Sequence, residues 1–207
     1  MGRDKALLPL PGVQHVSSHG DTSDIAHPYT TFLAQQSSIL SALCPHVVLV
    51  ARDQEQANLY APHLPSTVQI VLDQQPDIGP LMGLYSGLSV LAQFQADCAL
   101  VTAVDVPLLQ PSLARWLLTQ TSEREIIMPV VDDIPQVLLA VYPRAVLPQI
   151  EQRLREGRRD PRSLLQIAPV RYIEEAQLRQ VDPQLRSFLN VNTPEEFASL
   201  PPYTQGG

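Results

Sequence analysis

Cysteine, aromatic residues and long apolar runs are all scarce in this 207-residue sequence. Its two cysteines, Cys44 and Cys98, are too few for a disulfide framework, and each lies beside an apolar run, which favours free, buried thiols. No apolar stretch approaches the roughly 18 residues that a membrane-spanning helix needs. The N-terminus has no continuous apolar core of the signal-peptide kind, so we expect a soluble, cytoplasmic protein without a membrane partner.

Basic residues are also scarce, since 14 Lys and Arg stand against 21 Asp and Glu and give a formal net charge of -7 at pH 7. An acidic protein repels the phosphates of a long nucleic acid, which are normally bound by a basic surface. We therefore expect no nucleic-acid partner and only a small nucleotide as ligand. The length suits one hydrophobic core, so the sequence predicts a single domain over residues 1–207.

Apolar runs of strand length alternate with segments of helical period. The runs are nearly continuous in apolar character, as in strands covered on both faces, and lie at 47–51, 68–72, 99–104, 126–131 and 137–142. Apolar residues with helical spacing lie between several of them, at 32–43, 84–94 and 113–117. This order predicts an α/β fold of three layers, α/β/α, around a mostly parallel, Rossmann-like sheet.

Proline and capping residues mark the helix starts. Pro111, Pro161 and Pro194 each stand where a helix should begin, and Thr193 with Glu196 has the spacing of a capping box. These positions place helix starts better than helix ends.

Two segments lack apolar periodicity. Residues 12–28 hold serines, glycines, three histidines and two aspartates, which indicates a flexible surface insertion. Because no helix or strand fixes ligand geometry there, we do not expect its histidines to hold a metal. The tail at 201–207 is expected to fray.

Two aspartates follow strand runs, where ligands of open parallel sheets are bound. Asp105 comes directly after the run at 99–104, and Pro107 stops the backbone just afterwards, so the carboxylate should point out of the strand end. Such a hard oxygen ligand suits Mg²⁺ shared with nucleotide phosphates, whereas the structural alternative is an aspartate that caps the following turn. Asp73 occupies the same place after the run at 68–72, where a solvated turn residue is the alternative.

Two other segments are suited to an anion. The sequence GPLMG at 79–83 precedes a helical segment, and glycines there let backbone N–H groups approach a phosphate or a base, although a tight turn without a ligand fits as well. Lys5 follows Gly2 and Asp4 where a loop enters an apolar stretch. It is placed to offer a point charge to a polyphosphate, and its alternative is a solvated surface charge.

Amides and arginines in the second half of the chain form a further group of polar candidates. Asn190 and Asn192 flank Val191, so an extended segment would put both amides on one face, where they could bind a polar group or satisfy the loop backbone. Five arginines form a basic cluster: Arg153, Arg155, Arg158, Arg159 and Arg162. The cluster is either a solvated helix end or a binding site for an anion or a partner protein.

Four segments together resemble one family: MGRDK at 1–5, GPLMG at 79–83, VTAVDVP at 101–107 and NVNTPEE at 190–196. The family is that of the MobA-like nucleotidyltransferases that attach GMP to molybdopterin, the molybdenum cofactor guanylyltransferases, and the likeness covers nearly the whole chain. It implies a nucleotidyltransferase (GT-A type) sheet and transfer of GMP from GTP to molybdopterin with release of pyrophosphate. It also implies Mg²⁺ as cofactor, and proteins that deliver molybdopterin or accept the product as partners.

The resemblance also implies roles for the motif residues. Lys5 and Asp105 would be catalytic, with Lys5 neutralising charge on the transferred phosphoryl group and Asp105 binding the metal. The nucleotide-binding residues would be Lys5, Asp73, Gly79, Gly83 and Asp105. The molybdopterin-binding residues would be Asn190, Asn192, Arg158 and Arg159.

Family members open with an apolar strand and a glycine-rich loop, roughly Leu-x-Gly-Gly-x-Ser-x-Arg, immediately before the element that stands here at 1–5. A central strand leaves two exposed edges when it is lost, so we expect an in-frame segment of this type to be encoded upstream of Met1. A stop codon there would favour a non-catalytic nucleotide- or cofactor-binding protein. The resemblance does not decide between guanine and cytosine, because related enzymes transfer CMP to the same acceptor and others act on sugar phosphates.

Overall fold

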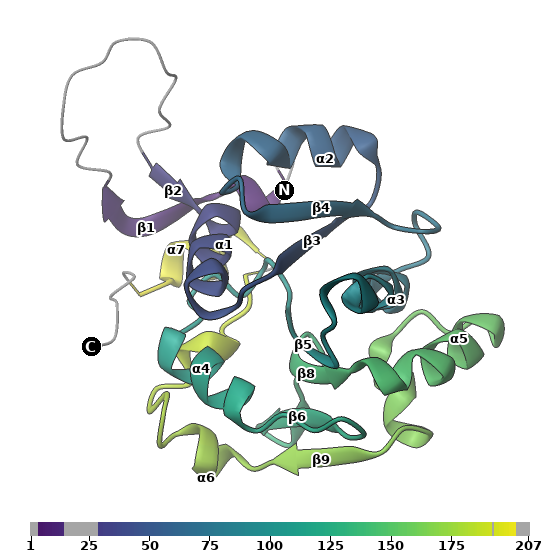
Figure 1. The fold of residues 1–207 in the computed structure, drawn as a ribbon. Helices are drawn as coiled ribbons and strands as arrows, with labels where there is room; N and C mark the ends of the chain where they lie inside the picture. The colour runs from purple at the N-terminus through teal and green to yellow at the C-terminus, as the bar shows by residue number, and fades with distance from the viewer. Residues whose placement is uncertain (1–3, 15–28, 192, 202–207) are drawn as a thin grey trace.

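The main β-sheet of the computed structural model, which describes residues 4–14, 29–191 and 193–201, has strands running in both directions (Figure 1). Its order is β5–β8–β6–β7, with β9 beside β6, and the strands are β5 (Cys98–Thr102), β6 (Ile126–Val131), β7 (Ile134–Pro135), β8 (Leu139–Pro143) and β9 (Val170–Ile173). β5, β6 and β9 run in one direction, whereas β7 and β8 run in the other. The expected α/β fold is confirmed.

Strand β8 departs from the expected parallel arrangement, because it lies between β5 and β6 and is antiparallel to both. Only residues 132–138 connect β6 to β8. A parallel return needs a crossover of about a dozen residues or more, so this short connection forces the chain back in the opposite direction.

Helices cover both faces of the main sheet (Figure 1). One face packs against α1 (Phe32–Leu43), α4 (Pro111–Thr119) and α6 (Glu175–Leu178), and the other against α3 (Pro80–Ser89) and α5 (Leu147–Arg155). Successive buried side chains alternate between the two cores: Ile127 and Val141 belong to the first, and Ile126 and Tyr142 to the second. The three-layer prediction is therefore confirmed for this sheet.

A second sheet pairs β3 (Val47–Ala51) with β4 (Val68–Leu72) in parallel, joined by α2 (Gln54–Tyr60) and η2 (Ala61–His63). In the described part of the chain, β3 pairs only with β4, and β5 only with β8. Residues 47–50 and all of β5 are half-buried, whereas β8 is fully buried. Helix α3 packs on both β3 and β5, so it connects the two sheets.

Helix α3 begins four residues earlier than the sequence suggested. Gly79 is its N-cap, with φ +112°, and Pro80 takes the first helical position, for which a fixed φ near -65° is suited. The helix ends at Ser89, and a 3-10 helix, η3 (Leu91–Phe94), follows. Gly83 thus lies inside the first turns of the helix and not in a loop before it.

Short elements lie near both ends of the described residues. η1 (Lys5–Leu7) leads into β1 (Pro9–Gln14), which pairs antiparallel with β2 (Tyr29–Thr31). β1 therefore extends into the segment at 12–28 that was expected to be irregular, and residues 15–28 lie outside the described residues, as do 202–207. Helix α7 (Pro194–Ser199) has the predicted capping box, with Thr193 Oγ1 accepting from the Glu196 N–H at 3.1 Å.

The remaining short helices are η4 (Arg144–Val146), η5 (Pro161–Gln166) and η6 (Arg186–Phe188). Pro161 thus opens a 3-10 helix rather than an α-helix, with Asp160 as its N-cap. Pro111 opens α4 as expected.

Both cysteines are free thiols, as expected. Cys44 and Cys98 are half-buried, and this burial raises the pKa of each thiol above its ordinary value.

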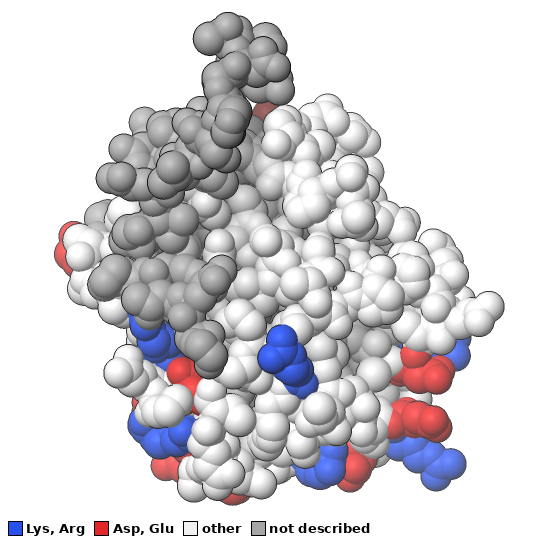
Figure 2. All heavy atoms as spheres, turned by 60° about the vertical axis from the view of Figure 1, so that its left-hand side comes forward, with Lys and Arg blue, Asp and Glu red and all other residues white. Residues whose placement is uncertain are grey.

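Charges of both signs are mixed on the face shown in Figure 2, where they gather in the lower part of the view. Arg179, the C-cap residue of α6, forms an ion pair with Glu175 at 2.7 Å. Within the described ranges, no helix combines the length and apolar character that crossing a membrane requires.

Candidate functional site

Asp105 lies in a turn three residues beyond the end of β5, and not directly at the strand end as predicted. The ladder between β5 and β8 stops at the pair Thr102–Leu139, because β8 begins there and Leu138 belongs to the preceding loop. Asp105 is half-buried, and its carbonyl oxygen accepts a hydrogen bond from the Val191 N–H at 2.9 Å. This bond joins the aspartate turn to the C-terminal asparagine segment.

A pocket of about 440 Å³ borders this turn. Four polar residues singled out in the sequence line it: Asp105, Arg159, Arg162 and Asn190. They come from three separate segments, so the fold brings together an acid, a cation and an amide that are far apart in sequence. Pro80, next to the N-cap glycine of α3, also lines the pocket.

One wall of the pocket was missed by the sequence analysis. Residues 135–139, at the end of the β6–β7 hairpin and the start of β8, line the pocket. Asp132 and Asp133 form the tip of this hairpin, both with positive φ (49° and 59°). Two aspartates between apolar runs are a hairpin signal, since Asp tolerates the left-handed region better than most residues. The two adjacent aspartates could therefore have predicted the hairpin that leads into this wall of the pocket.

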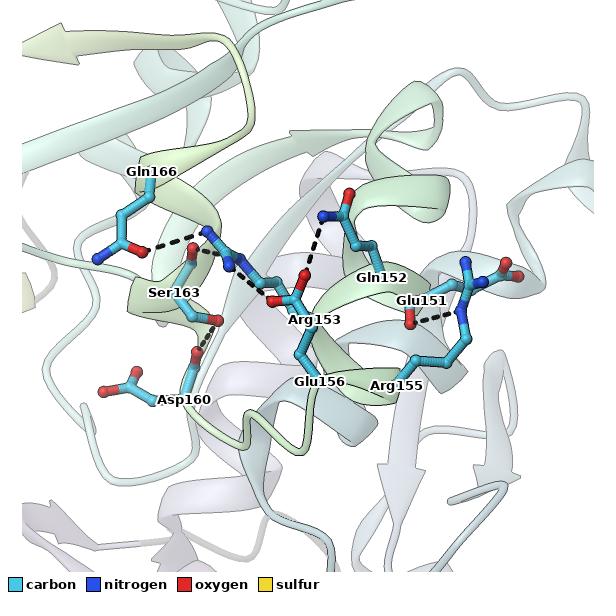
Figure 3. Close-up of polar contacts among 8 residues, drawn as sticks. All are labelled: Glu151, Gln152, Arg153, Arg155, Glu156, Asp160, Ser163 and Gln166. Carbon is cyan, nitrogen blue, oxygen red and sulfur yellow. Dashed lines mark hydrogen bonds and ion pairs between the residues drawn. The ribbon is translucent and has the colours of Figure 1, made fainter.

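The arginine-rich loop after α5 is held by a buried guanidinium (Figure 3). Arg153 is only 8% exposed, and it donates to the Ser163 carbonyl at 2.9 Å, to Glu156 at 2.7 Å and to Gln166 at 3.2 Å. Its own carbonyl accepts from the Arg158 N–H at 2.9 Å. Arg153 is thus a fixed structural member of the cluster, whereas Arg158 and Arg159 are exposed.

The same loop is attached to the start of α3. The Leu81 N–H donates to the Arg159 carbonyl at 3.0 Å. A Cβ added at Gly79 would meet the Arg159 Cβ at 3.3 Å, so the two backbones approach closely where only glycine fits without displacement. The GPLMG segment and the arginine loop are therefore one packed unit.

Asp73 follows β4 and faces the first turns of α3. A Cβ at Gly83 would lie 3.7 Å from Asp73 Oδ1, an oxygen that is buried and has no hydrogen-bond partner among the described residues. Burial raises the pKa of the Asp73 carboxyl above its ordinary value. An orphaned acceptor beside a glycine is suited to a donor group of a ligand.

Lys5 lies in η1, whose N-cap is Asp4. Asp4 accepts from the Ala6 N–H at 3.0 Å through Oδ1 and from the Tyr60 hydroxyl at 2.7 Å through Oδ2. Val104, the residue before Asp105, packs against the same small core as Ala6 and Tyr60. The half-buried Lys5 element is therefore packed next to the aspartate turn.

The structure divides the predicted residues into two groups. Asp105, Arg159 and Asn190 line the pocket. The predicted residues that do not line it are Lys5, Asp73, Gly79, Gly83 and Arg158. Asn192 lies outside the described residues. Among the residues that are described, no group of three or more His, Cys, Asp and Glu side chains could hold a metal on its own.

The sequence comparisons with known proteins agree on one family. The MobA-like NTP transferase domain matches residues 1–179. The chain is 27% identical over 176 residues to a protein of Methanosarcina mazei named "Probable molybdenum cofactor guanylyltransferase", covering 82% of this chain and 77% of that one. A protein of the same name from Chloroflexus aggregans is 31% identical over 176 residues, which cover 83% of this chain and 79% of that one.

The fold also matches a solved structure. The molybdopterin-guanine dinucleotide biosynthesis protein A from Archaeoglobus fulgidus superposes with a TM-score of 0.70 at 22% identity, over 95% of this chain and 88% of that one. This likeness concerns the arrangement of helices and strands.

Proposed function

Since the chain belongs to the MobA-like NTP transferase family, we propose that it transfers GMP from GTP to molybdopterin and releases pyrophosphate, as a molybdenum cofactor guanylyltransferase. The names of its curated relatives support this reaction. The observation that carries the proposal is the convergence of Asp105, Arg159 and Asn190 on one pocket. An acid, a cation and an amide around one cavity suit a reaction between two phosphate-bearing substrates.

Asp105 would hold Mg²⁺ in this reaction. Its half-buried carboxylate is a hard oxygen ligand at the pocket, and Mg²⁺ in nucleotide enzymes is typically bound by one or two carboxylates together with substrate phosphates. A single protein carboxylate therefore fits the ion, although no larger cluster exists among the described residues. When bound, Mg²⁺ would offset the negative charge of the pyrophosphate leaving group.

The nucleotide would lie on the side of the aspartate turn where η1 and α3 pack. Lys5 would face the phosphates and neutralise charge that develops on the transferred group. Gly79 and Gly83 would allow the nucleotide to approach the start of α3, and the orphaned Asp73 Oδ1 would accept a hydrogen bond from it.

Molybdopterin would occupy the pocket on the other side of Asp105. Arg158 and Arg159 would bind its terminal phosphate, and Asn190 and Asn192 would bind the polar pterin or the same phosphate. The attacking phosphate monoester is already anionic at neutral pH, so the reaction needs no general base. The contribution of the protein is to align this oxygen with the α-phosphorus of GTP.

A direct assay tests the proposal. Purified protein with GTP, Mg²⁺ and molybdopterin should release pyrophosphate and form the guanine dinucleotide, and Asp105→Ala should lower the rate by about 10²-fold or more. Glu123→Ala, at an exposed acid outside the pocket lining, is the matched control. An undiminished rate in Asp105→Ala contradicts the assigned chemistry.

The same assay separates the two alternatives. Preference for CTP in a nucleotide competition would replace guanylyl by cytidylyl transfer. Nucleotide binding without pyrophosphate release, in a chain that includes any upstream segment, would identify a binding protein.

A further inference from the structure

Gln36 is a buried glutamine of α1 whose side chain reaches the aspartate turn. The residue is 4% exposed. Its Nε2 donates to the Ala103 carbonyl at 2.9 Å and to the Val106 carbonyl at 2.7 Å. These carbonyls lie two residues before and one residue after Asp105, so one amide group uses both of its hydrogens to bracket that residue.

The rest of the turn is tied to other segments. The Ala103 N–H donates to the Leu138 carbonyl at 2.9 Å, and the Asp105 carbonyl accepts from the Val191 N–H at 2.9 Å. The Thr102 hydroxyl adds a longer contact of 3.3 Å to the Ala103 carbonyl. Among the residues that make these contacts, only Gln36 binds both ends of the turn through a single group. It is also the one that belongs to a helix.

The physical need for this contact follows from the end of β5. Beyond Thr102 the chain leaves the strand ladder, so the carbonyls of the turn have no strand partner. Without the Gln36 amide, the buried Val106 carbonyl would lose this donor, and the Ala103 carbonyl would keep only the longer Thr102 contact. An unpaired buried carbonyl is costly, so the chain would shift to satisfy it. Because Asp105 lies between the two carbonyls, such a shift would move its carboxylate.

We propose that Gln36 is a positioning residue that sets the direction of the Asp105 carboxylate into the pocket by holding the Ala103 and Val106 carbonyls. The inference rests on the proposed function, because it assigns Gln36 to the acid that would hold Mg²⁺. Gln36 acts through the backbone of the turn. In other metal sites, side chains that do not touch the metal orient its ligands in a comparable way.

The test compares the same substitution at two buried glutamines. Gln36→Met keeps the length of the side chain and removes both donors. Gln110→Met is the control, because Gln110 is 7% exposed and its Nε2 donates to one carbonyl, that of Leu108, at 2.7 Å. Both variants should lose stability in urea unfolding, so a loss of stability alone does not separate them.

Binding of Mn²⁺ in the presence of a non-reactive GTP analogue, followed by electron paramagnetic resonance, provides a readout independent of turnover. Gln36→Met should weaken the Mn²⁺ affinity by about 10-fold or more, whereas Gln110→Met should leave it unchanged. In an Asp105→Asn background, Gln36→Met should have no further effect, because it acts through that carboxylate. The Mg²⁺ concentration for half-maximal transfer should rise in parallel.

Equal Mn²⁺ affinities in Gln36→Met and wild type overturn the proposal, as does an additive effect in the Asp105→Asn background. Should Gln36→Met fail to fold, Gln36→Leu is measured instead, because its smaller side chain also removes both donors; the same outcomes apply. If wild-type protein binds Mn²⁺ and nucleotide but transfers no GMP, the proposed function fails while the Mn²⁺ comparison still decides the role of Gln36.

Discussion

The Leu81 N–H donates to the Arg159 carbonyl at 3.0 Å, which connects the first turn of α3 with the arginine loop. The two segments are far apart in sequence, and the proposed function assigns one to the nucleotide and the other to molybdopterin. A change at this contact should therefore affect both substrates.

Gly79→Ala tests that coupling. The residue has φ +112°, and the new Cβ would meet the Arg159 Cβ at 3.3 Å, so we expect a loss of about 1–3 kcal/mol in the free energy of unfolding. The KM values for GTP and for molybdopterin should both rise. Gly157→Ala is the control, because its φ of +75° is also strained but nothing lies within 4 Å of the added Cβ. A rise in only one KM for Gly79→Ala would contradict the coupling.

Arg153→Met should loosen the arginine loop first. The variant loses bonds to the Ser163 carbonyl, Glu156 and Gln166, so the free energy of unfolding should fall by about 1–3 kcal/mol. Steady-state kinetics should show a larger rise in the KM for molybdopterin than in the KM for GTP, because the loop contacts the start of α3 only through the Leu81–Arg159 bond and the close approach at Gly79. Glu156→Gln, which leaves the other two partners of Arg153 in place, should have a much smaller effect. Equal effects of the two variants would show that the guanidinium does not hold the loop.

Asp73→Asn should raise stability and weaken nucleotide binding. Burial raises the pKa of the Asp73 carboxyl in the folded protein, so the protonated form favours folding and ionisation opposes it. That contribution is fully present below the unfolded pKa of about 3.9 and is lost as the pH rises through the folded pKa. Urea unfolding should therefore find Asp73→Asn more stable than wild type at pH 7, with a smaller difference near pH 4. Its KM for GTP should be higher.

The control for this measurement is Glu123→Gln, which removes one negative charge at an exposed position. If Asp73→Asn is no more stable than wild type at pH 7, the carboxylate is not penalised by burial. An unchanged KM for GTP would remove Asp73 from the nucleotide site.

Tyr60→Phe should act on Lys5 through Asp4. The Tyr60 hydroxyl, whose pKa is raised by burial and then by its bond to Asp4, donates to Asp4 Oδ2 at 2.7 Å. Its loss should cost about 1 kcal/mol of stability and lower kcat, because η1 loses its link to α2. Tyr85→Phe removes a similar bond, from the Tyr85 hydroxyl to Glu151 at 2.8 Å, and serves as the control. Equal kcat values for the two variants would contradict the link to Lys5.

The strands that follow a simple apolar run could be predicted from the sequence. β3, β4 and β6 have the expected bounds, because runs rich in valine and isoleucine favour an extended backbone. β8 runs in the direction that the sequence did not reveal, since direction depends on the connection and not on the strand itself. The antiparallel direction of β8 follows from the short connection at 132–138.

The candidate site could be predicted in its residue types but not in its grouping. Asp105, Arg159 and Asn190 were singled out by their local motifs, yet their meeting in one pocket depends on the Val191–Asp105 and Leu81–Arg159 bonds. Gln36 was predicted only to lie in the helical segment at 32–43, because a local pattern does not reveal which carbonyls a side chain will meet far along the chain.

The separation of β3 from β5 in the described part of the chain has a consequence for solvent exchange. Each strand has one edge whose N–H groups lack a ladder partner there, whereas β8 is paired on both sides. Deuterium should therefore replace the amide hydrogens along these two edges sooner than those of β8, unless another extended segment lies along them. The exchange rates of β3 and β5 thus report directly on what borders these edges in the working protein.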